Sequence, residues 1–226
     1  MRILVINWQD RQNPHAGGAE LHLHEVFGRI AARGHDVDLL CSGFPEAARD
    51  AVLDGIRVRR VGSRFSFPLH ARREYEALAA EREYDIIVED LNKIPLYTPR
   101  WKPRRLVVIT HHLFGATAFR EESLAVAAAT WLAERPLGRG YRGVDFEAVS
   151  VSTRDDLVSR GIPSNRIRVI YNGVDVESLT PDPNVRSKIP LFSYLGRLKR
   201  YKRVDLVIRA FALLDGREAR LEIAGK

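Results

Sequence analysis

Two widely separated motifs of this sequence have the residue types needed to hold an anion. Gly17 and Gly18 open the segment GGAELHLHEVF, while Arg197 and Lys202 belong to the segment GRLKRYKRVD. Glycines let the backbone approach a ligand closely, and a helix that begins there points free N–H groups toward it. Arg and Lys can pair with a diphosphate. Each motif follows a short apolar run, ILVI or LFSYL, which indicates binding at the carboxyl ends of strands.

The glycine pair has a simpler alternative, a tight strand-to-helix turn that binds nothing. A dinucleotide-binding fold needs G-x-G-x-x-G here and an acidic residue at the end of the second strand. Neither is present, because the loop is long and the second strand ends in Cys41-Ser42, so the sequence does not favour NAD binding. Cys41 is the only cysteine, which excludes an internal disulfide and a cysteine-based metal site. We interpret it as a small apolar residue that closes a strand.

Histidines supply the candidates for proton transfer. His111 and His112 follow the run RLVVIT, at the strand end where α/β proteins place reactive groups. Such a histidine can hydrogen-bond a hydroxyl or transfer a proton, although both could instead bond backbone carbonyls in a loop. His22 and His24 are two residues apart on an expected helix and face different sides, which makes a poor metal pair. We predict no metal site.

Two further segments carry polar groups next to expected strand ends. Ser152 is predicted to cap the helix that follows FEAVSVS, and no G-x-S-x-G elbow surrounds Ser150, so a serine hydrolase is not supported. The segment YNGVD contains Asn172 and Gly173. It is either a simple turn or part of the lining of a cleft.

Short β-branched runs alternate with helical patterns along the chain. The alternation predicts an α/β fold with a doubly wound, mostly parallel, Rossmann-like sheet. The predicted helices cover residues 19–33, 70–82, 121–135, 153–160 and 203–214. Gly34 follows the first of them, as a C-terminal cap would.

The domain organisation follows from a change in composition after the last strand of this series. Residues 1–180 are predicted to form one Rossmann-like domain, and 181–190, rich in proline and polar residues, an interdomain linker. Residues 191–226 read as the first β-α-β unit of a truncated second domain. A unit of that size rarely buries enough surface to be stable alone.

The net charge of +7 favours an anionic partner, and nucleic acid, acidic lipid and sugar nucleotides all qualify. The basic clusters Arg57–Arg64 and Arg100–Arg105 lack a recognition helix or an RNA-binding signature, so we predict no nucleic-acid binding. No signal peptide and no run of 18 apolar residues is visible, and we expect a cytoplasmic location.

One basic segment also contains aromatic residues. In RFSFPLHARR, Phe65 and Phe67 are interleaved with Arg64, Arg72 and Arg73. Exposed aromatics beside cations favour peripheral contact with an anionic membrane, here at its inner face. The alternative is that both phenylalanines pack into the core and the arginines are solvated.

Four motifs in order resemble the family 4 (group 1) retaining glycosyltransferases of the GT-B fold. They are GGAELHLHEVFGRIAARGHDVDLL, the histidine after RLVVIT, SVSTRDDLVSRGIPSNRIRVIYNGVD and YLGRLKRYKRVDLVIRAF. The similarity extends over essentially the whole chain. It implies two facing Rossmann-like domains, with the acceptor on the N-terminal side and a nucleotide-diphosphate sugar held mainly by the C-terminal one.

The resemblance also assigns roles by position. It implies that the donor is bound by Gly17, Gly18, Asn172, Gly173, Arg197 and Lys202, and that His111 lies near the reacting sugar. It implies no metal or other cofactor, and an acceptor that is a glycan, a lipid or a small molecule. The leaving phosphate would accept the acceptor's proton in a same-face displacement, with His111 orienting or polarising.

The E-x7-E motif of the family has no counterpart within the 226 residues. We therefore expect this chain to bind sugar nucleotides weakly or not at all, and to be inactive alone. The alternative is a non-catalytic domain that binds an acceptor or a membrane.

Overall fold

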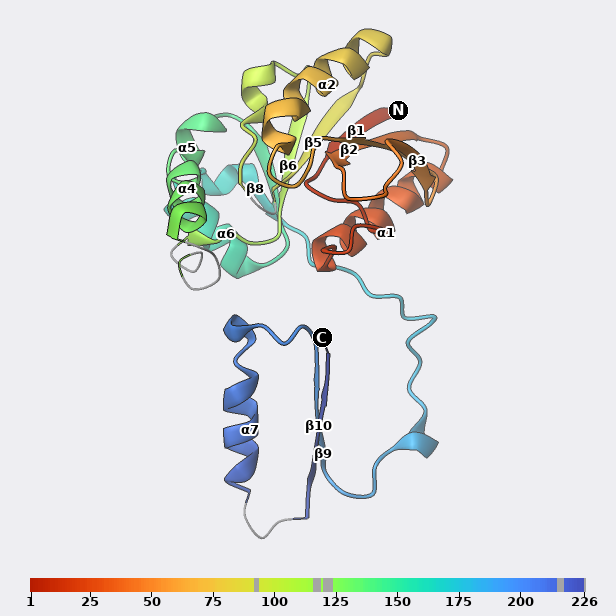
Figure 1. Cartoon of the computed structure of the whole chain (residues 1–226), viewed down its shortest axis with the longest axis vertical. Helices are drawn as coiled ribbons and strands as arrows, with labels where there is room; N and C mark the ends of the chain where they lie inside the picture. The colour runs from red at the N-terminus through yellow and green to blue at the C-terminus, as the bar shows by residue number, and fades with distance from the viewer. Residues whose placement is uncertain (92–93, 116–118, 120–123, 215–217, 226) are drawn as a thin grey trace.

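An eight-stranded sheet forms the framework of the first 170 residues in the computed structural model of the chain (Figure 1). The structure describes residues 1–226 except 92–93, 116–118, 120–123, 215–217 and 226. The strands run in the order β3-β4-β2-β1-β5-β6-β7-β8, and every pairing is parallel except that of β3 with β4. The predicted doubly wound, mostly parallel α/β sheet is confirmed.

The strands of this sheet are β1 (Arg2–Ile6), β2 (Asp36–Ser42), β3 (Asp50–Leu53), β4 (Ile56–Val61), β5 (Ile86–Leu91), β6 (Leu106–Thr110), β7 (Asp145–Ala148) and β8 (Ile167–Val169). The helices between them are α1 (Gly18–Ala32), α2 (Phe67–Glu81), α4 (Leu124–Glu134), α5 (Leu137–Gly140) and α6 (Val151–Ser159). Short 3₁₀ turns cover Thr98–Trp101 and Ser164–Arg166. Among the described residues, no helix is both long and apolar enough to cross a bilayer.

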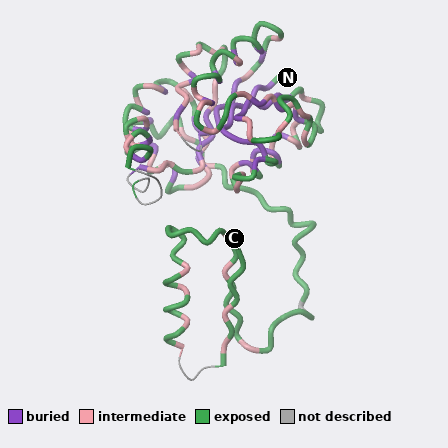
Figure 2. Tube along the Cα trace, in the orientation of Figure 1, coloured by how far each residue is buried: buried purple, intermediate pink, exposed green. Residues whose placement is uncertain are grey.

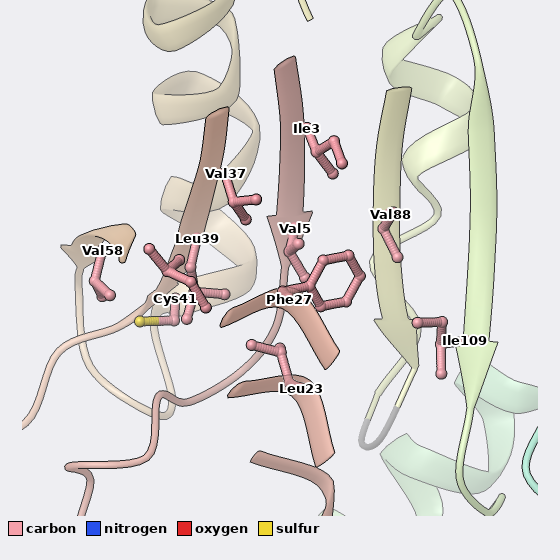
Figure 3. Close-up of a cluster of buried hydrophobic side chains, with 11 residues drawn as sticks. Ile3, Val5, Leu23, Phe27, Val37, Leu39, Cys41, Val58, Val88 and Ile109 are labelled. Carbon is pink, nitrogen blue, oxygen red and sulfur yellow. The ribbon is translucent and has the colours of Figure 1, made fainter. Parts of the chain in front are cut away.

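Both faces of strand β1 are buried, which explains its uninterrupted apolar run. Ile3 and Val5 join the cluster that contains Phe27 of α1, whereas Leu4 and Ile6 join the cluster that contains Phe67 of α2. Successive side chains of a strand point to opposite faces, so α1 and α2 cover opposite faces of the sheet. Figure 3 shows the first of these clusters, in which side chains from β1, β2, β5 and β6 surround those of α1.

The sheet has its topological switch point at β1. The chain passes from β1 through α1 to β2 on one side, and returns through α2 to β5 on the other side of β1. Ligands of open α/β sheets bind outside the carboxyl ends of the strands at such a point. The loop from Asn7 to Gly17 begins at this edge. His111, the residue after β6, lies at the same edge.

Strand β3 was not predicted, although the sequence contains the signal for it. Asp54 and Gly55 have φ of +53° and +77° and join β3 to β4 in a two-residue hairpin turn. A turn with positive φ at both central residues favours the Asp-Gly dipeptide. The sequence LDGI between two short β-branched runs therefore marks an antiparallel edge strand on an otherwise parallel sheet.

Helix positions agree with the sequence patterns, with one correction. The first helix, predicted over 19–33, is α1, and Gly34 after it has φ of +86° as a C-terminal cap requires. The prediction that Ser152 caps the fourth helix is wrong, because α6 begins two residues early. Ser150 is the N-cap, and its Oγ accepts the backbone N–H of Thr153. The first residues of the helix predicted over 121–135 lie outside the described residues.

A smaller β-α-β unit follows an exposed stretch after β8. It consists of β9 (Leu191–Leu195), α7 (Val204–Ala212) and β10 (Arg220–Ala224), with 3₁₀ turns at Pro183–Val185 and Arg200–Lys202. The two strands pair in parallel, and the rings of Phe192 and Phe211 join sheet to helix at a centroid distance of 5.9 Å. None of the described residues of this unit is buried, in contrast to the larger sheet (Figure 2).

Candidate functional site

The basic turn after β9 reaches the glycine loop before α1. The guanidinium of Arg197 donates to the carbonyl oxygen of His15 at 3.3 Å and also to that of Ala16. A Cβ built on Gly17 would lie 3.5 Å from an Arg197 nitrogen, which is van der Waals contact. The two motifs that the sequence predicted for the site are therefore in direct contact, although Gly17 and Arg197 are 180 positions apart.

The two glycines of the loop differ in what surrounds them. The amide of Gly17 donates to Glu20 Oε2 at 2.6 Å, in a capping box that fixes the start of α1. This N–H is therefore already used. A Cβ on Gly18 would meet no atom within 4 Å, so the space in front of Gly18 is open. The helix N-terminus is accessible there to an anion.

His111 occupies the edge of the sheet beside this loop. Its Nε2 lies 3.5 Å from Asp90 Oδ1, a distance that is long for a hydrogen bond but short enough for charge attraction. Its ring meets the ring of His22 edge to face, with the centroids 5.1 Å apart. Thr153 of α6 donates its hydroxyl to the His111 carbonyl at 3.0 Å. The histidine is thus held by β5, α1 and α6 together.

Neighbouring carboxylates favour the protonated form of His111. Burial lowers the pKa of His111, but Asp90, Glu20 and Glu147 act in the opposite direction and raise it above its ordinary value. Burial lowers the pKa of His22, and the charge of His111 lowers it further. Burial also raises the pKa of Glu147. Of the two histidines in contact, His111 therefore favours the protonated form and His22 the neutral form.

The second basic residue of the turn lies near the loop after β6. Burial, the charge of His111 and the charge of Lys202 together lower the pKa of His112. Lys202, from the smaller unit, thus acts on this loop through its charge. Arg197 contacts the loop before α1 directly.

Glu134, which no sequence motif indicated, fixes the loop after β6. This loop, His111–Gly115, is called the histidine loop below. Its fully buried carboxylate accepts the backbone N–H groups of Phe114 and Gly115 at 2.9 and 2.8 Å. Arg160 lies 3.6 Å from the same carboxylate. The sequence did contain a signal for this role, because Glu134 is the single acidic residue at the end of the apolar helix LAVAAATWLAE. A carboxylate buried with such a helix needs hydrogen-bond partners.

The prediction that His22 and His24 face different sides of the helix is confirmed. His24 is buried, and its Nδ1 lies 2.8 Å from Asp54, in the hairpin turn. His22 instead contacts His111, so it belongs to the site as a neighbour that the sequence analysis treated as weak. No group of three or more metal-ligating side chains occurs among the described residues.

Asn172 and Gly173 lie on the exposed stretch that follows β8. A Cβ on Gly173 would meet no atom within 4 Å, and the described residues offer Asn172 no hydrogen bond. The structure does not bring these two residues into contact with His111 or Arg197. Their part in donor binding stays a prediction.

Residues 16–178 match the model of Glycosyltransferase Family 4. The chain belongs to this family. It is 35% identical over 80 residues to the lipopolysaccharide 1,6-galactosyltransferase of Salmonella typhimurium, a stretch that covers 34% of this chain and 22% of that protein. The resemblance read from the sequence motifs is therefore confirmed.

Solved structures of low sequence identity share the fold. Sucrose-phosphate synthase of Thermosynechococcus elongatus superposes with a TM-score of 0.71 at 16% identity over 100% of this chain and 62% of its own. HepE of Anabaena, solved with UDP-glucose, gives 0.64 at 19% identity over 99% of this chain and 60% of its own. The fold is that of the GT-B glycosyltransferases, and the chain spans about 60% of the length of these structures.

Proposed function

We propose that this chain forms the acceptor-side domain and the diphosphate-binding turn of a retaining glycosyltransferase. The enzyme would move a sugar from a nucleoside-diphosphate sugar to an acceptor hydroxyl. The observation that carries the proposal is the contact of Arg197 with the loop that ends at Gly17. It puts a cation of the smaller unit beside the helix N-terminus of the larger sheet.

The chemistry of this arrangement is the handling of negative charge. Breaking the bond between a sugar and a diphosphate develops charge on the leaving phosphate, and cations already in position stabilise it without reorganisation. Arg197 would exchange its two carbonyl contacts for phosphate oxygens, which bind a guanidinium more strongly. Lys202 would act from the side of the histidine loop, and the open space at Gly18 admits the phosphates.

His111 would orient the reacting sugar by donating a hydrogen bond. Its raised pKa favours the protonated ring, which has donors at both nitrogens. One of them faces Asp90, so the other is available to a hydroxyl or a phosphate oxygen. In a same-face displacement the leaving phosphate accepts the acceptor's proton, and no protein nucleophile is required.

UDP-sugars are the first donors to test, because the HepE structures contain UDP-glucose or UDP. The assay follows UDP release by the complete protein, and NMR of the product reports the anomeric configuration.

Turnover with retention supports the proposal. EDTA should not affect this turnover, because Arg197 and Lys202 would neutralise the diphosphate without a metal ion. Inverted product, or an acceptor bound without any UDP release from a range of sugar nucleotides, contradicts it. The second result favours a non-catalytic acceptor- or membrane-binding domain. The 226-residue chain alone is expected not to turn over.

We further propose that the start of α2 touches an anionic membrane. Phe65 and Leu69 are 82% and 81% exposed, and the Arg64 guanidinium lies over the Phe65 ring. Phe67 does not take part, because it is fully buried against Trp8, and Arg72 pairs with Glu76 instead. Apolar rings beside a cation suit the boundary between headgroups and acyl chains.

Vesicle sedimentation tests the membrane contact. Phosphatidylglycerol vesicles should bind the chain at low salt, and Leu69→Ser should weaken the binding. Leu213→Ser is the matched control, because Leu213 is 84% exposed but belongs to the smaller unit. Equal loss in both variants, or equal binding to phosphatidylcholine, contradicts the contact.

A further inference from the structure

A buried histidine of α1 ties three parts of the larger domain together. His24 is only 2% exposed. Its Nε2 accepts the backbone N–H of Arg11 at 3.3 Å, and its Nδ1 lies 2.8 Å from Asp54 Oδ2. One nitrogen of the Arg11 guanidinium donates to both oxygens of Asp54, at 2.8 and 2.7 Å. The imidazole ring thus joins α1 to the loop before it and to the hairpin turn between β3 and β4.

These contacts allow only one protonation state of the ring. A backbone N–H can only donate, so Nε2 of His24 must present its lone pair to Arg11. An ionised carboxylate can only accept, so Nδ1 must carry the proton that faces Asp54. His24 is therefore neutral, in the Nδ1–H form, when both bonds are made. A second proton on Nε2 would point at the Arg11 N–H and exclude that bond.

Charged groups act on His24 from both segments packed against it. Burial lowers the pKa of His24, Asp54 and Asp10 raise it, and the charge of Arg11 lowers it. The balance leaves the pKa below its ordinary value of 6.5. The bond to the Arg11 amide is therefore complete at neutral pH, and it is lost as the pH falls below 6.5 toward the folded-state value.

The hairpin turn gives Asp54 a fixed position against α1. A Cβ on Gly28 would lie 3.2 Å from both the Cβ and the carbonyl oxygen of Asp54, so the helix and the turn are in close contact there. Gly28 follows His24 by four residues and lies on the same side of the helix. The ring is thus held between two elements of the rigid sheet domain, and the loop is attached to it.

The loop held at Arg11 leads directly to the candidate site. Its residues His15 and Ala16 accept the guanidinium of Arg197 through their carbonyls. The amide of His15 donates to Asn13 Oδ1 at 2.9 Å, and that of Ala16 donates to the Asn13 carbonyl at 2.8 Å. These bonds connect the part of the loop beside the ring to the part that meets the smaller unit.

We propose that neutral His24 is a positioning residue, which holds the loop Asn7–Gly17 where it meets Arg197 and the donor phosphates. The donor part of this proposal rests on the proposed function, whereas the fixation of the loop does not. Protonation of His24 breaks its bond to the Arg11 amide and releases the loop at that point. Donor binding then weakens in acid, although His24 acts only through the loop and contacts no reacting group.

The ring nitrogen chemical shifts of His24 in the labelled 226-residue chain test its protonation state. At about pH 7.5 they should show the Nδ1–H form, and well below pH 6.5 the doubly protonated ring. Hydrogen exchange of the Arg11 amide should become less protected as the second proton binds. An Nε2–H ring at neutral pH, or an Arg11 amide equally protected in both states, overturns the proposal.

Two variants divide the bonds of the ring between them. The side-chain oxygen of His24→Gln reaches the place of Nε2 and can accept from Arg11, whereas the amide of His24→Asn reaches only that of Nδ1 and can bond Asp54. At about pH 7.5 the amide shifts of Gly17 and Gly18 should be kept in His24→Gln and changed in His24→Asn. A purely structural ring would give equal changes in both variants, which contradicts the proposal. The ring shifts require no variant, so they decide even if His24→Asn does not fold.

Calorimetry with UDP-glucose tests the effect on the donor. Its diphosphate is esterified at both ends, so it lacks the ionisation near pH ~6 of a terminal phosphate. The unmodified chain should bind it about three- to tenfold more weakly at about pH 5.5 than at about pH 7.5, as expected for one lost hydrogen bond. His24→Gln should lose this pH dependence. His35→Gln should keep it, because His35 lies beyond the other end of α1.

The same acid loss in His24→Gln as in the unmodified chain would assign the pH dependence to another group and overturn the role of His24 in donor binding. If no form binds UDP-glucose at either pH, the proposed transfer fails. In that case the exchange of the Arg11 amide and the glycine shifts of the two variants still decide whether His24 positions the loop.

Discussion

The two parallel β-α-β regions of this chain have similar local patterns but very different burial. In the larger sheet, strands β1 and β2 carry residues such as Leu4 and Leu39 with no exposed surface, because helices cover both faces. In the smaller unit the corresponding apolar residues are open, with Leu195 86% and Phe192 48% exposed. Local pattern makes a strand, whereas burial depends on the layers around it. The candidate site combines a rigid scaffold from one region with cations from the other.

The difference in burial between the two regions should have its largest effect on the free energy of unfolding, when a core residue is truncated. Phe67→Ala removes a fully buried ring and should lower the free energy of unfolding by about 3–5 kcal/mol. Phe192→Ala removes the same group from a half-exposed position and should cost less than about 1 kcal/mol. Urea unfolding followed by circular dichroism measures both. Similar costs for the two variants would contradict the contrast between the regions.

A smaller effect is expected at the carboxylate that fixes the histidine loop. Glu134→Ala leaves the amides of Phe114 and Gly115 without their acceptor and should cost about 2–3 kcal/mol. Glu83→Ala is the control, because Glu83 forms an exposed ion pair with Arg104. If the two variants unfold at the same urea concentration, Glu134 does not hold the loop in the way described.

The smallest effect is electrostatic and concerns the histidine pair. Because the folded-state pKa of His111 is raised, its protonation stabilises the fold fully below its ordinary pKa of 6.5, and this contribution is lost as the pH rises through the folded value. NMR titration should show His111 losing its proton above pH 6.5 and His22 below it. Asp90→Asn should lower the pKa of His111. A value that does not change in this variant would remove Asp90 as the cause.

Sequence patterns predicted the framework because strand and helix periodicity is local. They located α1 and the loop residue Gly17, and the resemblance supplied the connection to Arg197. They did not select Glu134, whose partners are the backbone amides of a loop some twenty residues away, a contact that only the tertiary fold creates. The hairpin at Asp54 was missed even though its Asp-Gly signal is local.

Other parts of the site could not be predicted from the sequence either, because they also depend on contacts that only the tertiary fold creates. The contact of His22 with His111 joins α1 to the end of β6, and a cavity of about 1100 Å³ is lined by the carboxyl ends of β1, β2 and β4 and by α2. Neither follows from residue spacing. Charge composition predicted an anionic partner, but only the fold brings Arg197 to the loop before α1.

Titration of UDP into the isotopically labelled chain, followed by NMR, tests most directly whether Arg197 and the glycine loop form one diphosphate site. We expect binding weaker than about 1 μM that shifts the amides of Gly17 and Gly18. Arg197→Ala should weaken it by about 1.5–3 kcal/mol without changing stability, because the lost bond is charge-assisted. Arg209→Ala, an exposed arginine of α7, should bind UDP like the unmodified chain. Unshifted glycine amides, or equal UDP affinity in Arg197→Ala and the unmodified chain, would contradict the account.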